Sequence, residues 1–258
     1  MYDDIASLYH LVYPNWNEAI KQQGAALNNV VNTLMGSAPL SILDVSCGIG
    51  TQALGLAALG HTVTASDLSA AAVERARKEA MSRGLEITFK VADMRQCAET
   101  HGSGFDVVLS ADNSLPHLPG EDEVRIALQG FYKCLSKGGV AIVNLREYRE
   151  DEDRSSPQTW PYGFRYDGSD RYFVFQTRDW SNNVYDVAMY FVREVREGTP
   201  ASVTAGLSRY YAITVDRLMF LFQEVGFTDV QRLDGILHQP IVVGRRRTAQ
   251  QPACTPTV

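Results

Sequence analysis

The stretch that decides the fold is Asp44–Ala53, with the sequence DVSCGIGTQA. Before it, Leu40–Val45 has the apolar character of a buried strand, and after it Thr51–Leu59 has the small-residue pattern of a helix. Gly48 and Gly50 allow a tight turn between the two and let a ligand approach the backbone closely. The helix that follows would present its first N–H groups to that ligand. The stretch therefore predicts a ligand-binding turn at the end of a strand.

The alternation of strand and helix continues outward from this turn. Apolar runs predict further strands over His61–Ser66, Glu86–Val91, Phe105–Ser110, Val140–Leu145, Asp229–Leu233 and Pro240–Gly244. Helical periodicity predicts helices over Ser69–Arg83, Glu121–Leu135 and Asp216–Val225. We therefore expect an α/β, Rossmann-like fold with a mostly parallel sheet and helices on both faces.

Residues 147–212 interrupt this alternation. Within them, Trp160–Phe191 holds 11 of the chain's 25 aromatic residues. The pattern predicts two strands, Tyr172–Thr177 and Val184–Val192, joined across residues 180–183. We expect an antiparallel β insertion over the edge of the sheet or over the active site. Residues 246–258 are polar and aperiodic, which is typical of a frayed tail.

The composition excludes several classes of protein. With 258 residues, of which 45% are hydrophobic and 21% charged, the chain can build a core without disulfide bridges. The formal net charge of −6 has the wrong sign for binding nucleic acid over a broad surface. No signal-peptide pattern and no apolar run near the roughly 18 residues of a membrane span are present. The four cysteines follow neither metal-site nor disulfide spacing, which favours the cytoplasm and no metal.

Three aspartates end consecutive predicted strands. Asp44 is placed to receive a cationic or amino-bearing group, and Asp67 to accept two ribose hydroxyls. Asp93 is placed to accept a hydrogen bond from an adenine amino group, while Met94 packs on the ring. These acids suit a ligand with ribose and adenine but without phosphate.

The glycine turn by itself leaves a second ligand open. Gly48-x-Gly50-x-x-Ala53 also fits the dinucleotide fingerprint, with the acid Asp67 19 positions beyond Gly48. Asp44 would repel a pyrophosphate, however, so the set favours S-adenosylmethionine over NAD.

Over Ile42–Leu145 the chain resembles the class I S-adenosylmethionine-dependent methyltransferases. The order and spacing of the glycine turn and the strand-end acids match that family's motif series, although Ser46 replaces its usual first glycine. The resemblance implies seven strands, of which the last runs antiparallel to the rest. It also implies S-adenosylmethionine as cofactor, held by Tyr9, Asp44, Ser46, Gly48, Gly50, Asp67, Leu68, Asp93, Met94 and Ser110.

A closer resemblance follows the fourth predicted strand. Asp112–Pro119, DNSLPHLP, is similar to the Gly-Asn-Ser-Phe-Ala-His-Leu-Pro stretch of glycine N-methyltransferases. Arg146 matches that family's arginine that grips the acceptor's carboxylate, and Tyr2–Ala6 resembles its cofactor-covering segment. The glycine/sarcosine methyltransferases are therefore the nearest family. Asp112 and Leu115–Pro116 depart from its pattern.

This resemblance implies catalytic or acceptor-contacting roles for Asn113, His117 and Arg146. It implies one methyltransferase domain over residues 1–245, with a lid at 1–30 and the insertion at 147–212. Without it, Tyr9, Tyr13 and Trp16 also fit the apolar stripe of one amphipathic helix.

The sequence thus predicts methyl transfer from S-adenosylmethionine to the amine of a small molecule. Glycine, sarcosine or a similar amino acid is the expected acceptor, with neither nucleic acid nor membrane as partner and the oligomeric state open. Three alternatives stay open. These are methylation of another small molecule at O or C, with His117 as base, a nicotinamide oxidoreductase, and a cofactor-binding module without turnover.

Overall fold

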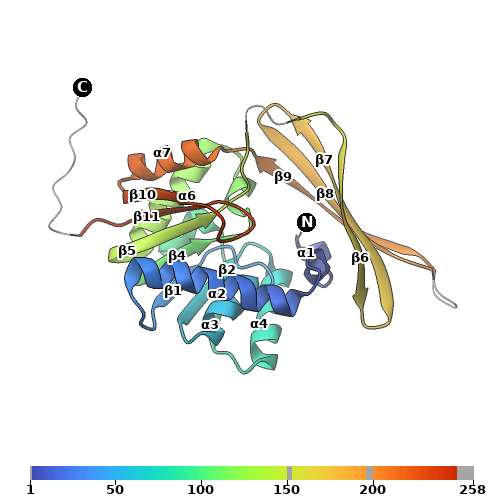
Figure 1. The fold of residues 1–258 in the computed structure, drawn as a ribbon, viewed down its shortest axis with the longest axis horizontal. Helices are drawn as coiled ribbons and strands as arrows, with labels where there is room; N and C mark the ends of the chain where they lie inside the picture. Colours follow the sequence, from blue (N-terminus) through green and yellow to red (C-terminus); the bar gives the residue numbers. More distant parts are fainter. Residues whose placement is uncertain (1, 150–152, 196–199, 249–258) are drawn as a thin grey trace.

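The computed structural model describes residues 2–149, 153–195 and 200–248. Its main sheet has seven strands in the order β10-β11-β5-β4-β1-β2-β3 (Figure 1). All of its pairs are parallel except those of β11, which runs antiparallel to β5 and to β10. This confirms the predicted α/β fold and its single reversed strand. The strands are β1 (Ser41–Asp44), β2 (Thr62–Asp67), β3 (Ile87–Val91), β4 (Phe105–Ser110), β5 (Leu135–Asn144), β10 (Thr228–Leu233) and β11 (Ile241–Arg245).

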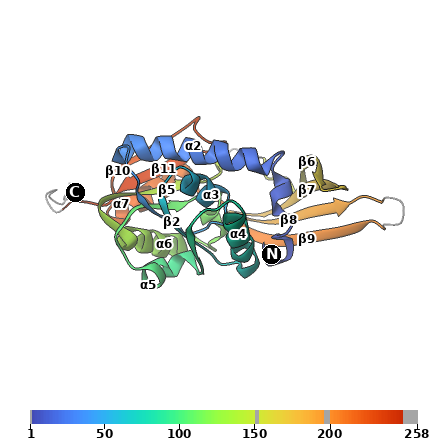
Figure 2. The same ribbon diagram turned by 90° about the horizontal axis from the view of Figure 1, so that it is seen from below.

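Helices cover both faces of this sheet (Figure 2). They are α1 (Tyr2–Ile5), α2 (Trp16–Met35), α3 (Thr51–Ala58), α4 (Ala70–Ser82), α5 (Cys97–His101), α6 (Glu121–Cys134) and α7 (Val215–Val225), with 3-10 turns η1 (Tyr9–Val12), η2 (Met94–Gln96) and η3 (Leu115–His117). Helices α2, α3 and α4 pack on one face, and α5, α6 and α7 on the other.

The strands are apolar on both sides because both faces are covered. Ile42 packs into the cluster under α2 and α3, whereas the next residue, Leu43, packs into the cluster under α6 and α7. Successive side chains of a strand point to opposite faces, so a strand buried on both faces loses the polar alternation of a half-exposed one.

The interpretation of Tyr9, Tyr13 and Trp16 as one helical stripe is wrong. Tyr9 lies in η1, Tyr13 has an extended backbone, and Trp16 is the first residue of α2. Between them, Asn15 caps α2 by accepting a hydrogen bond from the Glu18 N–H group. Helix α2, which packs closely along α3, was not among the predicted helices.

The insertion forms a second sheet of four antiparallel strands, not two. They are β6 (Gln158–Asp167), β7 (Asp170–Ser181), β8 (Val184–Arg193) and β9 (Ser202–Tyr211), in that order. Strands β7 and β8 contain the two predicted strands, whereas β6 and β9 are the edges. Strand β6 is hard to predict from the sequence, because its residues Pro161 and Gly163 normally indicate a loop. An edge strand such as β6 tolerates them.

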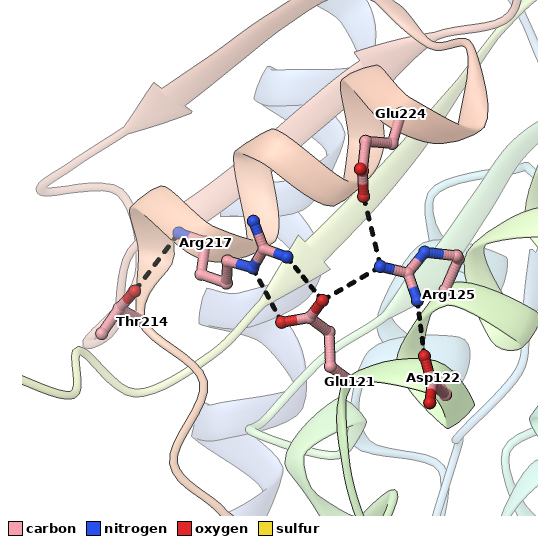
Figure 3. Close-up of polar contacts among 6 residues, drawn as sticks. All are labelled: Glu121, Asp122, Arg125, Thr214, Arg217 and Glu224. Carbon is pink, nitrogen blue, oxygen red and sulfur yellow. Dashed lines mark hydrogen bonds and ion pairs between the residues drawn. The ribbon is translucent and has the colours of Figure 1, made fainter.

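A cluster of ion pairs joins α6 to α7 on the side of the molecule next to the insertion (Figure 3). The Glu121 carboxylate accepts from Arg217 (2.7 Å from Nε) and from Arg125 (3.0 Å). Thr214 caps α7 through the Arg217 N–H group. Because Glu121 follows the loop after β4 and Thr214 follows β9, the cluster holds the ends of these two segments together.

Two observations complete the fold. Among the described residues, no helix is long and apolar enough to cross a membrane. Most of the predicted tail, from residue 249 onward, lies outside the described residues.

Candidate active site

A cavity of about 490 Å³ lies at the carboxyl ends of β1, β2, β3 and β4. Its walls come from the loops after these strands, from α1 and η1, and from β9 of the second sheet. In open α/β sheets, ligands bind outside the carboxyl ends of the strands, and the volume suits a small molecule or cofactor. The cavity therefore lies where the glycine turn predicts a ligand.

The glycine turn has the backbone shape that a close-approaching ligand needs. Gly48 and Gly50 have φ values of +51° and +96°, which favour glycine. The Gly48 N–H group donates to Asp67 Oδ2 at 2.8 Å, which ties the turn to the end of β2. Ser46 is not among the residues with positive φ, so the turn accepts a serine there. Its hydroxyl lies 3.0 Å from that of Ser110.

Asp44, the last residue of β1, is an acid with an unused acceptor. Its Oδ1 accepts from the Ser46 N–H group at 3.1 Å, whereas its buried Oδ2 has no hydrogen-bond partner in the described structure. Burial, together with the nearby charge of Asp67, raises the pKa of Asp44 to about 7. A cationic group at this edge of the sheet would favour the ionised carboxylate.

Asp67 lies in the cavity wall with both carboxylate oxygens oriented by the backbone. Besides Gly48, the Ser69 N–H group donates to it, at 2.9 Å. Burial raises its pKa, while these two hydrogen bonds lower it. The next residue, Leu68, also lines the cavity and leaves 71% of its surface exposed. An acid beside an exposed apolar side chain fits a ribose linked to a flat base.

Asp93 and Met94 line the same side of the cavity. The Asp93 carboxylate accepts four hydrogen bonds from Arg95, three from its guanidinium and one from its N–H group. Arg95, which also lines the cavity, lowers the pKa of Asp93 and forms an ion pair with Glu123. Because Nε contacts both oxygens, these contacts come from three donor atoms, so most of the acceptor capacity of Asp93 is used within the protein.

The amino-terminal segment closes the cavity. Tyr2, Asp3, Tyr9 and Tyr13 contribute side chains to its wall. Asp3 accepts from the Ser69 hydroxyl at 2.7 Å and from the Ala71 N–H group at 2.9 Å. These contacts attach α1 to the first turn of α4.

His117, in η3, also lines the cavity. Its Nε2 lies 2.9 Å from the Tyr2 hydroxyl and its Nδ1 2.9 Å from the Ser208 hydroxyl of β9. Burial lowers the pKa of His117 to about 4, so the imidazole is neutral near pH 7. Both ring nitrogens are engaged by hydroxyls.

Asn113 and Arg146 do not reach the cavity wall. Asn113 Oδ1 accepts from the Arg146 N–H group at 2.9 Å, and its amide nitrogen donates to the Tyr148 hydroxyl at 3.0 Å. The Arg146 guanidinium lies 5.2 Å from the centre of the Tyr148 ring. Asn113 therefore fixes the segment after β5.

The cavity thus gathers some of the predicted residues and leaves others behind its wall. Those in the wall are Tyr9, Ser46, Gly48, Asp67, Leu68, Asp93, Met94 and His117. Those behind it are Asp44, Gly50, Ser110, Asn113 and Arg146.

The wall also contains Tyr2 and Asp3, which belong to the segment expected to cover the cofactor. Further wall residues that were not predicted as contacts include Tyr13, Arg95, Asp112 and Arg209. The sequence alone could have indicated Asp112, because an aspartate stands there in place of the glycine of the family that the loop resembles. Nothing in the sequence indicates Arg209, since β9 comes beside the cavity only through the pairing of the second sheet.

The site fits S-adenosylmethionine on its own chemistry. Asp44 offers an unused oxygen to a cation, Asp67 faces the cavity with a carboxylate, and Gly48 leaves the backbone uncovered. No basic cluster that would neutralise a pyrophosphate occurs at the glycine turn among the described wall residues, of which only Arg95 and Arg209 are basic.

Comparison with known proteins agrees with this assignment. A methyltransferase-domain family model matches residues 42–139. Human glycine N-methyltransferase is 32% identical over 123 residues, so the match spans 42% of this chain and only 41% of that protein.

Two solved structures share the fold at low identity. Streptomyces venezuelae DesVI superposes with a TM-score of 0.80 at 21% identity, covering 93% of this chain and 97% of the other. S-adenosylmethionine-bound CalS10, an amino pentose methyltransferase from Micromonospora echinaspora, gives 0.74 at 19%, covering 93% and 95%. Residues 42–139 therefore match a methyltransferase domain, and the chain as a whole shares the fold of these two solved structures.

Proposed function

We propose that this protein transfers the methyl group of S-adenosylmethionine to the amine of a small molecule that also carries a carboxylate. Glycine, sarcosine or a similar amino acid is the expected acceptor. The observation that carries the proposal is one cavity lined both by the cofactor-type residues that follow β1, β2 and β3 and by His117, Asp112 and β9. The likeness to glycine N-methyltransferase supports the acceptor class.

At the cofactor end, we assign Asp67 to the ribose and Leu68 and Met94 to the adenine. Asp44 and Ser46 support the cationic part, with Ser110 behind them and Gly48 and Gly50 shaping the turn. Tyr9 covers the cofactor from the amino-terminal segment. The bound cofactor supplies an activated methyl group, so the protein's contribution is orientation and electrostatics.

Two neighbouring arginines outside the cavity wall, Arg146 and Arg178, favour a carboxylate. Burial and the positive charge of Arg146 both lower the pKa of Arg178, on β7. Arg178 makes no ion pair with a described carboxylate; its guanidinium lies 4.8 Å from the centre of the Trp160 ring. An anionic group placed here would be attracted by two guanidinium groups. This pair supports a carboxylate-bearing acceptor, with Asn113 holding the Arg146 backbone in place.

The state of His117 favours nitrogen over oxygen as the acceptor atom. A hydroxyl needs a general base, and a base acts best when its pKa lies near the working pH. With a pKa of about 4 and both nitrogens engaged, His117 is a weak base and acts instead as a neutral part of the wall. An amine needs no such base once it is in its free form.

The remaining features are consistent with a small-molecule enzyme of the cytoplasm. The described cysteines Cys47, Cys97 and Cys134 are free and buried, and the net charge of −6 disfavours nucleic acid as substrate. We propose residues 1–245 as one domain, with residues 1–30 as lid and 147–212 as insertion.

The test is a transfer assay that measures release of S-adenosylhomocysteine over a panel of glycine, sarcosine, other amino acids, amino sugars and simple phenols. The proposal expects turnover on an amino acid and none on phenols. Turnover on phenols alone would establish O-methylation instead. Tight cofactor binding without turnover on any compound would indicate a binding module, and binding of NADH would indicate an oxidoreductase.

A further inference from the structure

Asp112, directly after β4, is the feature of the cavity that the proposed function leaves unexplained. It lines the cavity, and its side chain is exposed there. It has a φ of +56°, a conformation that favours glycine, and the family that the loop resembles has glycine here. Aspartate tolerates this conformation, so the exchange keeps the turn and adds a carboxylate to the cavity wall.

The side chain does not serve the turn. The Asp112 backbone is held by its own N–H group, which donates to Asn144 Oδ1 at 3.0 Å. Aspartate often supports a turn by accepting from a backbone N–H group two residues on. Here the carboxylate receives, within the described structure, only the hydrogen bond from the Tyr13 hydroxyl to Oδ2, at 2.8 Å.

Four tyrosines lie near this acid. Besides Tyr13, the tyrosines Tyr2, Tyr9 and Tyr162 lie close enough for the Asp112 charge to raise their pKa values. They come from α1, from η1 and from β6, so three separate segments face it. A carboxylate ringed by tyrosine faces and hydroxyls suits a small cation.

No permanent positive charge of the described protein neutralises Asp112. It takes part in no ion pair with a described lysine or arginine, and His238, in the turn before β11, is the basic group whose charge acts on it. The protein that encloses the cavity shields this carboxyl from bulk water and raises its pKa, although the residue keeps accessible surface inside the cavity. A ligand that brought a positive charge or an N–H donor would complete the site.

We propose that Asp112 binds the amine of the methyl acceptor and restricts acceptors to primary and secondary amines. Tyr13 holds Oδ2, so Oδ1 is the atom left for the ligand. The amine attacks as the free base, and one N–H group that it keeps donates to Oδ1. A tertiary amine has no such N–H group once it is free, so methylation stops at the tertiary stage. This inference rests on the proposed function, since it names the residue that selects the amine.

The charges of Asp112 and of Arg178 both act on the same tyrosine, Tyr162. The pKa of Tyr162 is raised by Asp112 and lowered by Arg178, so both charges act on one ring. A molecule with an amine at Asp112 and a carboxylate toward Arg178 matches this polarity, as a short amino acid does. An amino sugar matches the acid alone.

The experiment compares wild-type protein with Asp112→Asn. Asparagine has the same size and tolerates positive φ, so the backbone is preserved. With sarcosine, or the best amine of the panel, we expect KM to rise roughly 10- to 100-fold. Thermal stability and the calorimetric Kd for S-adenosylmethionine should stay unchanged. N,N-dimethylglycine should not be methylated by the wild-type protein.

Asp122→Asn is the matched control, because the Asp122 side chain is 93% exposed on α6 and is not part of the cavity wall. An unchanged KM in Asp112→Asn, or methylation of N,N-dimethylglycine at a rate similar to that of sarcosine, would overturn this inference alone. A change in the cofactor Kd with KM unchanged would reassign Asp112 to the cofactor and also overturn it. Absence of turnover by the wild-type protein on every amine would overturn the proposed function with it.

Discussion

At the scale of single residues, the site depends on acids held in a water-poor edge of the sheet. Asp44 and Asp67 end neighbouring parallel strands, and burial raises the pKa of both. Backbone N–H groups offset part of the desolvation cost of each carboxylate. Ser46 donates to Asp44, and Gly48 and Ser69 donate to Asp67. The arrangement is poised for a cationic nucleoside, which would stabilise both ionised carboxylates.

Asp67→Ala should weaken binding of S-adenosylmethionine by roughly 100-fold or more, because it removes a wall carboxylate and the anchor of the Gly48 N–H group. Isothermal titration calorimetry measures the change. Asp122→Ala, at the exposed start of α6, should bind normally. An affinity equal to that of the wild type would show that Asp67 does not hold the ribose.

Asp44 predicts a pH dependence of cofactor binding. Its pKa is raised to about 7 in the free protein, and a cation binds better to the ionised form. The affinity for S-adenosylmethionine should therefore fall as the pH drops below 7, by up to about tenfold per pH unit. Calorimetry from pH 5.5 to 8 tests this. Asp44→Asn should remove most of the slope, and an equal slope in that variant would contradict the role.

At the scale of elements, the strands of the main sheet could be predicted closely. Phe105–Ser110 is confirmed residue for residue, because a strand covered on both faces is a continuous apolar run between turn signals. The edge strands β6 and β9 could not be predicted, since they are polar or carry proline and glycine. Only their pairing with β7 and β8 defines them.

The same limit applies to the site. The glycine turn and the strand-end acids are local in sequence, so their placement followed from the pattern. The partners of His117 are not local. Tyr2 and Ser208 lie 115 and 91 positions away, and only the meeting of α1, η3 and β9 brings them together.

The attachment of the amino-terminal segment to α4 predicts an effect on cofactor release. The Arg75 guanidinium donates to the carbonyl oxygens of Ala6 and Ser7 and is not part of the cavity wall. Arg75→Met keeps the apolar stem and removes both hydrogen bonds. We expect the cofactor Kd to rise about tenfold, mainly through faster dissociation.

Stopped-flow displacement of the cofactor measures that dissociation rate. Lys78→Met, an exposed position on the same helix, serves as the control and should leave the rate unchanged. If Arg75→Met released the cofactor at the wild-type rate, the segment would not act as a cover.

At the scale of the whole molecule, two sheets enclose one cavity. The strand ends of the parallel sheet form its floor, and β9 and the amino-terminal segment close it. The ion-pair cluster around Glu121 joins the segments that leave this region (Figure 3). A buried acid outside the cavity wall, Asp44, and a buried histidine in the wall, His117, then give opposing pH dependences of folding stability.

The sign for Asp44 follows from its raised pKa. The folded state binds the Asp44 proton more tightly than the unfolded chain does, so this residue lowers stability as the pH rises from about 4 to about 7. The pKa difference corresponds to about 4 kcal/mol at most. His117 acts oppositely, because its lowered pKa reduces stability as the pH falls from about 6.5 to about 4.

Urea unfolding of Asp44→Asn and wild-type protein, without cofactor, separates the two effects. The stability of the variant relative to the wild type should increase between pH 5 and 7 and stay level above pH 7.5, while the contribution of His117 cancels in the difference. A difference that does not change with pH would contradict the raised pKa of Asp44.

The central claim is that a methyl group passes from S-adenosylmethionine to an amine nitrogen in this cavity. The most direct measurement uses S-adenosylmethionine carrying a ¹³C-labelled methyl group, with sarcosine as acceptor and the product observed by NMR. The account predicts a labelled N-methyl resonance of N,N-dimethylglycine together with S-adenosylhomocysteine, and a much weaker signal for Asp112→Asn. No labelled amine with any amino acid of the panel, or label found only on oxygen or carbon, would contradict it.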